Sequence, residues 1–135
     1  MHSILVVDDE PDVRESIKFV LDRAGYTVRA VGSAMDAFIE LARNPTDLVI
    51  TDIIMPQING VEAIETIRKK FPAVRIIAIS GGGNFGITEY QPTAITTTAY
   101  LASAERAGAY LALTKPFEAN ELIQAVETVL GVGHA

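Results

Sequence analysis

The sequence has 135 residues, 49% of them hydrophobic, and a formal net charge of −6. This length suits one domain with a sizeable core, and the acidic balance argues against a nucleic-acid partner, because phosphate contacts need clustered Lys and Arg. The absence of cysteine excludes disulfides and thiolate chemistry. Without a basic signal-peptide start or an apolar run near the ~20 residues of a membrane span, we expect a cytoplasmic domain that does not insert into membranes.

Short apolar runs alternate with segments of helical periodicity in the first part of the chain. We expect strands at 4–7, 27–31, 48–52 and 74–79, and helices at 11–24, 34–43 and 61–71, the second of them ended by Asn44-Pro45. Pro11 is placed to open the first helix and Gly25 to end it, while Ser33 is a candidate N-cap for the second. Strands and helices that alternate with short connections predict a parallel sheet covered by helices on both faces.

The alternation breaks at residues 81–98, which are rich in Gly and Thr and have no clear period. Helical spacing resumes at 100–107, and a fifth strand at 110–114 precedes the last helix at 122–130. The expected organisation is therefore an α/β fold over 1–135 as a single domain, with five strands and five helices.

Polar residues follow four of the expected strands at the same end. Asp52 closes a buried apolar run, Asp8 and Asp9 follow the first strand, Ser80 follows the fourth, and Lys115 the fifth. In an open α/β sheet, ligands bind at the carboxyl ends of the strands. Each of these residues also has a local explanation as a cap, a turn residue or a solvated lysine. Their coincidence at one edge favours a shared site.

Three carboxylates in one place repel one another unless a cation compensates them. A hard divalent ion with oxygen ligands, Mg²⁺ or Mn²⁺, fits such a cluster. Lys115 adds a positive charge and Ser80 a hydroxyl donor, which together suit the charged oxygens of a transferred phosphoryl group. Asp52 is the expected nucleophile, since a carboxylate can form an aspartyl phosphate.

As a set, these motifs resemble the receiver domain of two-component response regulators, of the stand-alone type. The matching segments are Val6-Val7-Asp8-Asp9-Glu10, Asp52-Ile53-Ile54-Met55-Pro56 with Asn59-Gly60, Ile79-Ser80, and Lys115-Pro116-Phe117. The resemblance implies a flavodoxin-like, doubly wound five-stranded parallel sheet in the order 2-1-3-4-5. It also implies a phosphorelay signalling switch rather than an enzyme, with only self-catalysed phosphoryl transfer and autodephosphorylation.

The resemblance further implies roles for single residues. Asp52 would accept a phosphoryl group from the phosphohistidine of a sensor histidine kinase or phosphotransfer protein, and the domain would signal through another, unknown protein. Asp8, Asp9, Asp52 and the backbone carbonyl of Ile54 would hold Mg²⁺. Lys115 and Ser80 would each bind a phosphoryl oxygen, Ser80 would report phosphorylation to the surface, and the peptide bond after Lys115 would be cis.

The sequence departs from the family pattern at the expected switch. Receivers usually carry Tyr or Phe three positions before the lysine, where this chain has Ala112. Tyr110 lies on the same expected strand face, and we hypothesise that Tyr110 or an aromatic residue of the long stretch takes over this role. Partner recognition is expected on the surface formed by Tyr100 to Thr114 and the preceding loop. Alternatively, no aromatic switch operates, and the chain is a pseudo-receiver that binds partners independently of phosphorylation.

The second departure is the spacing of 35 positions between Ser80 and Lys115 (115 − 80), which is longer than usual in the family. It makes 81–98 an insertion. We expect this segment to be the most mobile and to change conformation on phosphorylation, with a passive insertion as the alternative.

Two other readings have less support. Residues 81–86 satisfy G-x-G-x-x-G, and Glu105 follows at about the spacing of a ribose-binding acid, but no helix follows the glycines directly, so no nucleotide cofactor is expected. A metal-dependent phosphatase would share Asp52 as nucleophile, but the sequence identifies neither a substrate pocket nor a general acid for it.

Overall fold

The computed structural model describes residues 2–53, 60–80, 104–115 and 117–131. Five parallel strands form one sheet in the order β2-β1-β3-β4-β5, which confirms the expected fold class and strand order. The strands are β1 (Ser3–Val7), β2 (Thr27–Val31), β3 (Leu48–Asp52), β4 (Arg75–Ser80) and β5 (Leu111–Thr114). The labelled helices are α1 (Pro11–Arg23), α2 (Ala34–Arg43), α3 (Gly60–Lys70) and α5 (Ala119–Leu130), and residues 104–107 add a helical turn.

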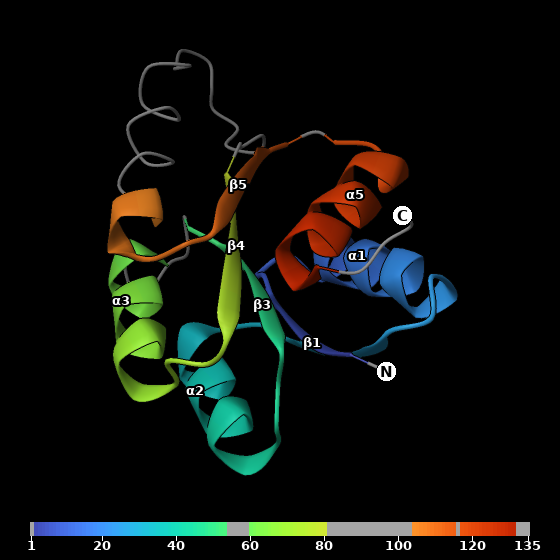
Figure 1. The fold of residues 1–135 in the computed structure, drawn as a ribbon. Coiled ribbons are helices and arrows are strands. Elements are labelled where there is room, and N and C mark those ends of the chain that lie inside the picture. The colour runs from blue at the N-terminus through green and yellow to red at the C-terminus, as the bar shows by residue number, and fades with distance from the viewer. Residues whose placement is uncertain (1, 54–59, 81–103, 116, 132–135) are drawn as a thin grey trace, which may run out of the picture.

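Two layers of helices enclose the sheet (Figure 1): α1 and α5 lie on one face, and α2 and α3 on the other. Successive side chains of a strand point to opposite faces. Thus Ile4 and Val6 of β1 join the core under α1 and α5, whereas Leu5 and Val7 join the core under α2 and α3. Both faces of the three inner strands β1, β3 and β4 are buried, which explains why these strands are largely continuous apolar runs rather than alternating ones.

The strand register brings the carboxyl ends of the strands to one edge of the sheet. Val7, the last residue of β1, lies opposite Thr51 of β3, and Asp52 lies opposite Ile79 of β4. Ser80 lies opposite Thr114 of β5. The residues that follow these strands therefore emerge side by side, although they come from distant parts of the sequence.

Local signals set the helix ends much as expected. Pro11 occupies the first turn of α1, and Gly25 follows that helix with a φ of 102°, a conformation that favours glycine. The Ser33 side chain caps α2 by accepting a hydrogen bond of 3.1 Å from the Asp36 backbone N–H. None of the helices in the described part of the chain has the length and apolar character needed to cross a membrane.

Several strand and helix boundaries differ from the expectation by one to three residues. β4 runs from Arg75 to Ser80, α3 begins at Gly60, and α5 begins at Ala119. β5 begins at Leu111, so that Tyr110 precedes the strand. Its backbone N–H still donates to the Ile76 carbonyl, at 2.7 Å. The insertion at 81–98 and the first residues of the helix expected at 100–107 lie outside the described residues.

Candidate functional site

Three aspartates meet at the carboxyl edge of the sheet. Asp8, Asp9 and Asp52 each have a carboxylate oxygen that lies within 4.8 Å of such an oxygen of the other two. Asp8 is 1% exposed and Asp52 6% exposed, whereas Asp9 is exposed. The structure thus brings together the three acids that the sequence placed at this edge.

The strands hold the two buried aspartates by their backbones. The Asp8 backbone N–H donates to the Val31 carbonyl at the end of β2, at 3.2 Å, and its Oδ1 accepts from the Glu10 backbone N–H, at 2.9 Å. Asp52 is the last residue of β3, and the next backbone N–H, that of Ile53, donates to the Ile79 carbonyl at 3.0 Å. These contacts fix both carboxylates at the start of the loops that leave the sheet.

Lys115 supplies the positive charge next to this cluster. Its Nζ lies 3.1 Å from Asp52 Oδ2 and 3.3 Å from Asp8 Oδ2, and its backbone N–H donates to the Ser80 carbonyl at 2.7 Å. Burial of the ammonium group on its own lowers the pKa of Lys115, but the charges and hydrogen bonds of Asp52 and Asp8 outweigh it and raise the pKa above its usual range. Lys115 therefore stays charged at neutral pH and links two strand ends that are far apart in sequence.

Ser80 contributes a buried hydroxyl at the end of β4. The residue is 0% exposed, and its Oγ has no hydrogen-bond partner within the described part of the chain. Buried hydroxyls usually have a partner. An unpaired one beside the acids and Lys115 has a donor and two lone pairs available for a ligand.

The donor set fits a small hard cation. Oxygen ligands alone, with two buried carboxylates and one exposed carboxylate, match the preference of Mg²⁺ for a few carboxylates plus water. The ammonium of Lys115 already contacts two of these carboxylates, which shows that the cluster attracts positive charge. The Ile54 carbonyl, expected as a further ligand, lies outside the described residues.

Two residues near the acids were not singled out from the sequence as site residues. Glu10 Oε1 lies 3.8 Å from Lys115 Nζ, and Arg14 Nη1 donates to the Asp8 carbonyl at 2.9 Å. Adjacency to Asp8 and Asp9 was a possible signal for Glu10. For Arg14, the only signal was its place in the first turns of the helix that follows the acids, which does not tell where a long side chain folds.

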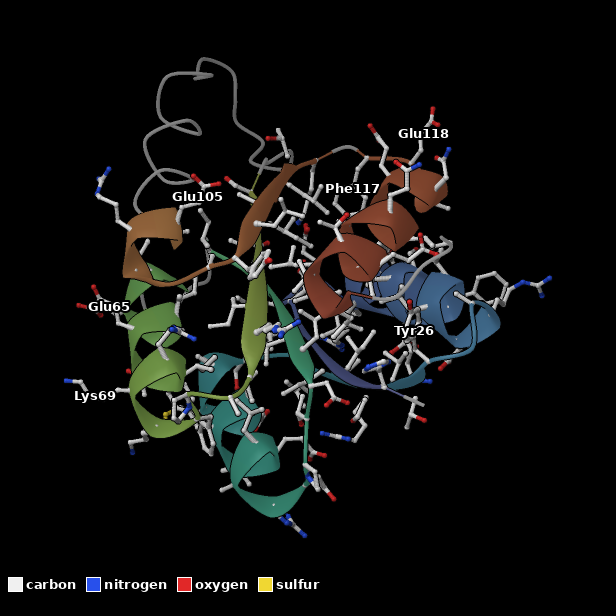
Figure 2. The ribbon with its side chains drawn as sticks, viewed as in Figure 1. Tyr26, Glu65, Lys69, Glu105, Phe117 and Glu118 are labelled. Atoms are coloured by element: carbon white, nitrogen blue, oxygen red, sulfur yellow. The ribbon has the colours of Figure 1, made fainter. Side chains whose placement is uncertain are left out.

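The other expected residues lie farther from the acids or outside the described part. Ala112 is half-buried and packs against the core under α2 and α3, while Tyr110 is 59% exposed. Tyr100 and Pro116, and with Pro116 the peptide bond expected to be cis, lie outside the described residues. So do the glycines of 81–86, and Glu105 is exposed on the turn 104–107 (Figure 2).

The segment after Lys115 joins the site to the core. Phe117 lies between β5 and α5 (Figure 2) and packs against the core under α1 and α5. The Glu118 side chain accepts from the Glu121 backbone N–H, and the Glu118 backbone N–H donates to the Glu121 side chain at 2.7 Å, which forms a capping box. Lys115 is thus held between an anchored strand and a capped helix.

The sequence and the fold have clear relatives. The profile of the response regulator receiver domain family matches residues 4–127. The DNA-binding transcriptional regulator NtrC of Azospirillum brasilense is 38% identical over 128 residues, which are 95% of this chain and 24% of that protein. The chain spans about a quarter of the length of the first curated relatives that it matches.

Solved structures of similar length share the fold. The receiver domain of NtrX from Brucella abortus has a TM-score of 0.81 and 31% identity, and the match covers 96% of this chain and 99% of that one. Response regulator protein TrrA from Thermotoga maritima, crystallised in complex with Mg²⁺-BeF, has a TM-score of 0.78 and 32% identity over 96% of this chain and all of the other.

Proposed function

Because the chain belongs to the response regulator receiver domain family, a family of signalling domains that partner with histidine kinases, we propose that Asp52 accepts the phosphoryl group of such a kinase. The donor would be a phosphohistidine of the kinase itself or of an intermediate phosphotransfer protein. The observation that carries the proposal is the position of Asp52, which ends β3 with Lys115 Nζ at 3.1 Å and two more aspartates beside it.

In the transfer, an oxygen of Asp52 forms a bond to phosphorus. The phosphorus–nitrogen bond of the phosphohistidine breaks, and its electron pair returns to the imidazole. Lys115 and Ser80 are proposed to bind oxygens of the transferred group. Lys115 is already within 3.3 Å of both buried carboxylates, so a short displacement of its ammonium would follow the negative charge from Asp52 to the phosphoryl oxygens.

Asp8, Asp9 and Asp52 are proposed to hold Mg²⁺ or Mn²⁺, together with the Ile54 carbonyl. When bound, the cation would neutralise part of the charge of the acids and of the phosphoryl oxygens. The complex of TrrA with Mg²⁺-BeF supports this for a relative with 32% identity. Asp9 is exposed. This suits its proposed role, because both the cation and the phosphoryl donor would have to reach the site from solvent.

The phosphorylated domain is proposed to signal through another protein. Ser80 would sense the phosphoryl group, and Tyr110 or Tyr100 would alter the partner surface, because Ala112 cannot act as an aromatic switch. Tyr110 precedes Thr114, the neighbour of Ser80, by four positions (114 − 110), or about 13 Å of strand. It would therefore act at the surface rather than fill space beside Ser80. The whole chain of 1–135, with its insertion at 81–98, is proposed to work as one cytoplasmic receiver unit.

The deciding experiment is the intact mass of the protein after incubation with acetyl phosphate and Mg²⁺. We expect wild type to gain about one phosphoryl group, Asp52→Ala to gain none, and Asp36→Ala, which removes an exposed aspartate of α2, to behave as wild type. A gain in Asp52→Ala equal to that of wild type would overturn the assignment of Asp52.

Ala112 supports a second candidate, a pseudo-receiver that binds partners without phosphorylation. No mass gain in wild type, despite Mg²⁺ binding in calorimetry, would favour this candidate. The unpaired Ser80 hydroxyl and the contact between Lys115 and Asp52 favour the phosphorylated switch instead.

A further inference from the structure

Arg14 of α1 reaches back to the loop that carries the acids. Its Nη1 donates to the backbone carbonyl of Asp8 at 2.9 Å, and its side chain is half-buried. The guanidinium thus contacts a backbone atom of one of the candidate metal ligands, without itself offering an oxygen to a cation. Charged donors make stronger hydrogen bonds than neutral ones, so this contact is a firm link between α1 and the end of β1.

The space for the guanidinium depends on Gly32, which follows β2. A Cβ added at Gly32 would lie 2.9 Å from Arg14 Nη1 and 3.7 Å from its Cζ. Gly32 is not among the glycines with positive φ in the described part of the chain. The position therefore needs no unusual backbone conformation. A side chain there would push aside the flexible end of Arg14, so the space that glycine leaves is the space that the Arg14 guanidinium occupies.

The hydrogen bond of Arg14 acts on the peptide that joins the two neighbouring acids. The Asp8 carbonyl and the Asp9 N–H belong to the same planar peptide unit. The Asp8 backbone N–H is bound by Val31, and its two carboxylate oxygens by Glu10 and Lys115. The remaining polar atom of Asp8 is its carbonyl oxygen, and Arg14 binds it. This contact therefore sets the direction in which the chain continues to the exposed Asp9.

We propose that Arg14, seated in the space left by Gly32, is a positioning residue that orients the Asp8–Asp9 peptide and thereby aims both carboxylates at the cation. This inference rests on the proposed function, because it concerns the Mg²⁺ site of the same receiver. Partners that orient metal ligands typically contribute 10- to 100-fold to metal affinity. Arg14 acts through the backbone rather than on a carboxylate, so we expect an effect at the lower end of this 10- to 100-fold range. Arg14→Met should therefore raise the Mg²⁺ Kd about tenfold.

The test is calorimetric titration of the full chain with MgCl₂. Arg14→Lys keeps the charge and one donor and should recover part of the affinity. Gly32→Ala should raise the Kd severalfold, because its Cβ displaces the guanidinium but leaves the charge on the chain. The variant with both Arg14→Met and Gly32→Ala should bind no more weakly than Arg14→Met alone, since both changes remove the same contact.

Lys18→Met is the matched control. It removes a positive charge from the same helix, but Lys18 pairs with Asp22 and not with the acids. Its Mg²⁺ Kd should stay within about twofold of wild type. Melting without metal, followed by circular dichroism, shows which variants are folded; if Arg14→Met fails to fold, Gly32→Ala and Arg14→Lys carry the test.

Two results would overturn the role of Arg14. One is a Mg²⁺ Kd within twofold of wild type in Arg14→Met and Gly32→Ala, or in whichever of the two is folded. The other is a loss of Mg²⁺ affinity in Lys18→Met that is as large as the loss in Arg14→Met. A wild-type protein that binds no Mg²⁺ would overturn the metal site and the role of Arg14 together. Wild-type binding with unchanged variants would overturn only the role of Arg14, so the two failures are distinguishable.

Discussion

Among single residues, Lys115 decides the charge balance of the acidic cluster. It is the cation that contacts both buried aspartates in the described structure, with its Nζ at 3.1 and 3.3 Å from their carboxylates. Removing one partner of a buried ion pair leaves the other charges desolvated and uncompensated. The contact that we propose to prepare the site for a phosphoryl group therefore also stabilises the metal-free fold.

Lys115→Met should lower the free energy of unfolding of the metal-free protein by about 1–3 kcal/mol at pH 7. Because Asp52 and Asp8 raise the pKa of Lys115 above its usual 10.5, this stabilisation is fully present below that pH and is lost as the pH rises through the elevated pKa. Urea unfolding in EDTA between pH 7 and 11 should show wild type approaching Lys115→Met at the alkaline end. Lys70→Met, which removes an exposed lysine of α3, serves as control. A difference in unfolding free energy between wild type and Lys115→Met that grows with pH would contradict the prediction.

Tyr110 is the residue on which the proposed signalling route depends. It is 59% exposed, so a role at the partner surface predicts that its ring changes environment when Asp52 is phosphorylated. Ring resonances in NMR, assigned with Tyr110→Phe, should shift on addition of acetyl phosphate and Mg²⁺ in wild type but not in Asp52→Ala. The ring of Tyr26, which packs against the core beside α1, should keep its resonances. Unchanged Tyr110 signals in phosphorylated protein would remove it from the switch.

At the scale of elements, the close approach of α3 to the end of β3 fixes the backbone next to Asp52. The first residue of α3, Gly60, donates its backbone N–H to the Ile53 carbonyl at 3.2 Å. A Cβ at Gly60 would overlap the backbone of Ile53, the residue after Asp52. Backbone cannot rotate away as a flexible side chain can, so α3 approaches this closely only with glycine at its start.

Gly60→Ala should lower the free energy of unfolding by roughly 2 kcal/mol or more and slow phosphorylation by acetyl phosphate, because it displaces Ile53, the residue after Asp52. Gly25→Ala is the comparison: its φ of 102° imposes backbone strain, but nothing lies within 4 Å of the added Cβ. It should cost about 1 kcal/mol and leave phosphorylation unchanged. Urea titration and intact-mass kinetics measure both effects, and a smaller effect in Gly60→Ala than in Gly25→Ala would contradict the close-approach argument.

For the whole molecule, the proposed metal site should couple metal binding to stability. The sheet holds three aspartates with ligand oxygens within 4.8 Å of one another, a set that the unfolded chain does not assemble. A ligand that binds only the folded state stabilises it by mass action. Mg²⁺ should therefore stabilise the domain as a whole, and not just the loops that contact the cation.

At a Mg²⁺ concentration of 100 times Kd, the free energy of unfolding should rise by about 2.7 kcal/mol, and EDTA should reverse the change. Asp9→Asn removes an exposed carboxylate that we propose as a ligand, without disturbing the buried core, and should abolish most of this increment. Asp36→Asn, on the surface of α2, should retain it. Thermal melts at increasing MgCl₂ measure the increments; an equal rise in Tm for Asp9→Asn and wild type would place the cation elsewhere.

The fold was largely predictable because its signals are local. Apolar runs, helical periodicity and end signals such as Pro11 and Ser33 gave the elements, and their alternation gave a parallel sheet, with the family resemblance adding the strand order. Several boundaries were off by one residue, such as those at Gly60 and Tyr110, and the start of α5 by three, because the ends of a strand or helix depend on neighbouring backbone as well as on composition.

The sequence by itself determined which residues reach the carboxyl edge of the sheet: Asp8, Asp9, Asp52, Ser80 and Lys115. Any parallel sheet with these strands delivers them there. Only the tertiary structure decided the contacts among them, such as Lys115 Nζ with Asp8 Oδ2 across 107 positions, and Arg14 with the Asp8 carbonyl beside Gly32. Periodicity describes neighbours along the chain, whereas these contacts depend on strand register and on the path of long side chains, which are fixed only when the layers pack.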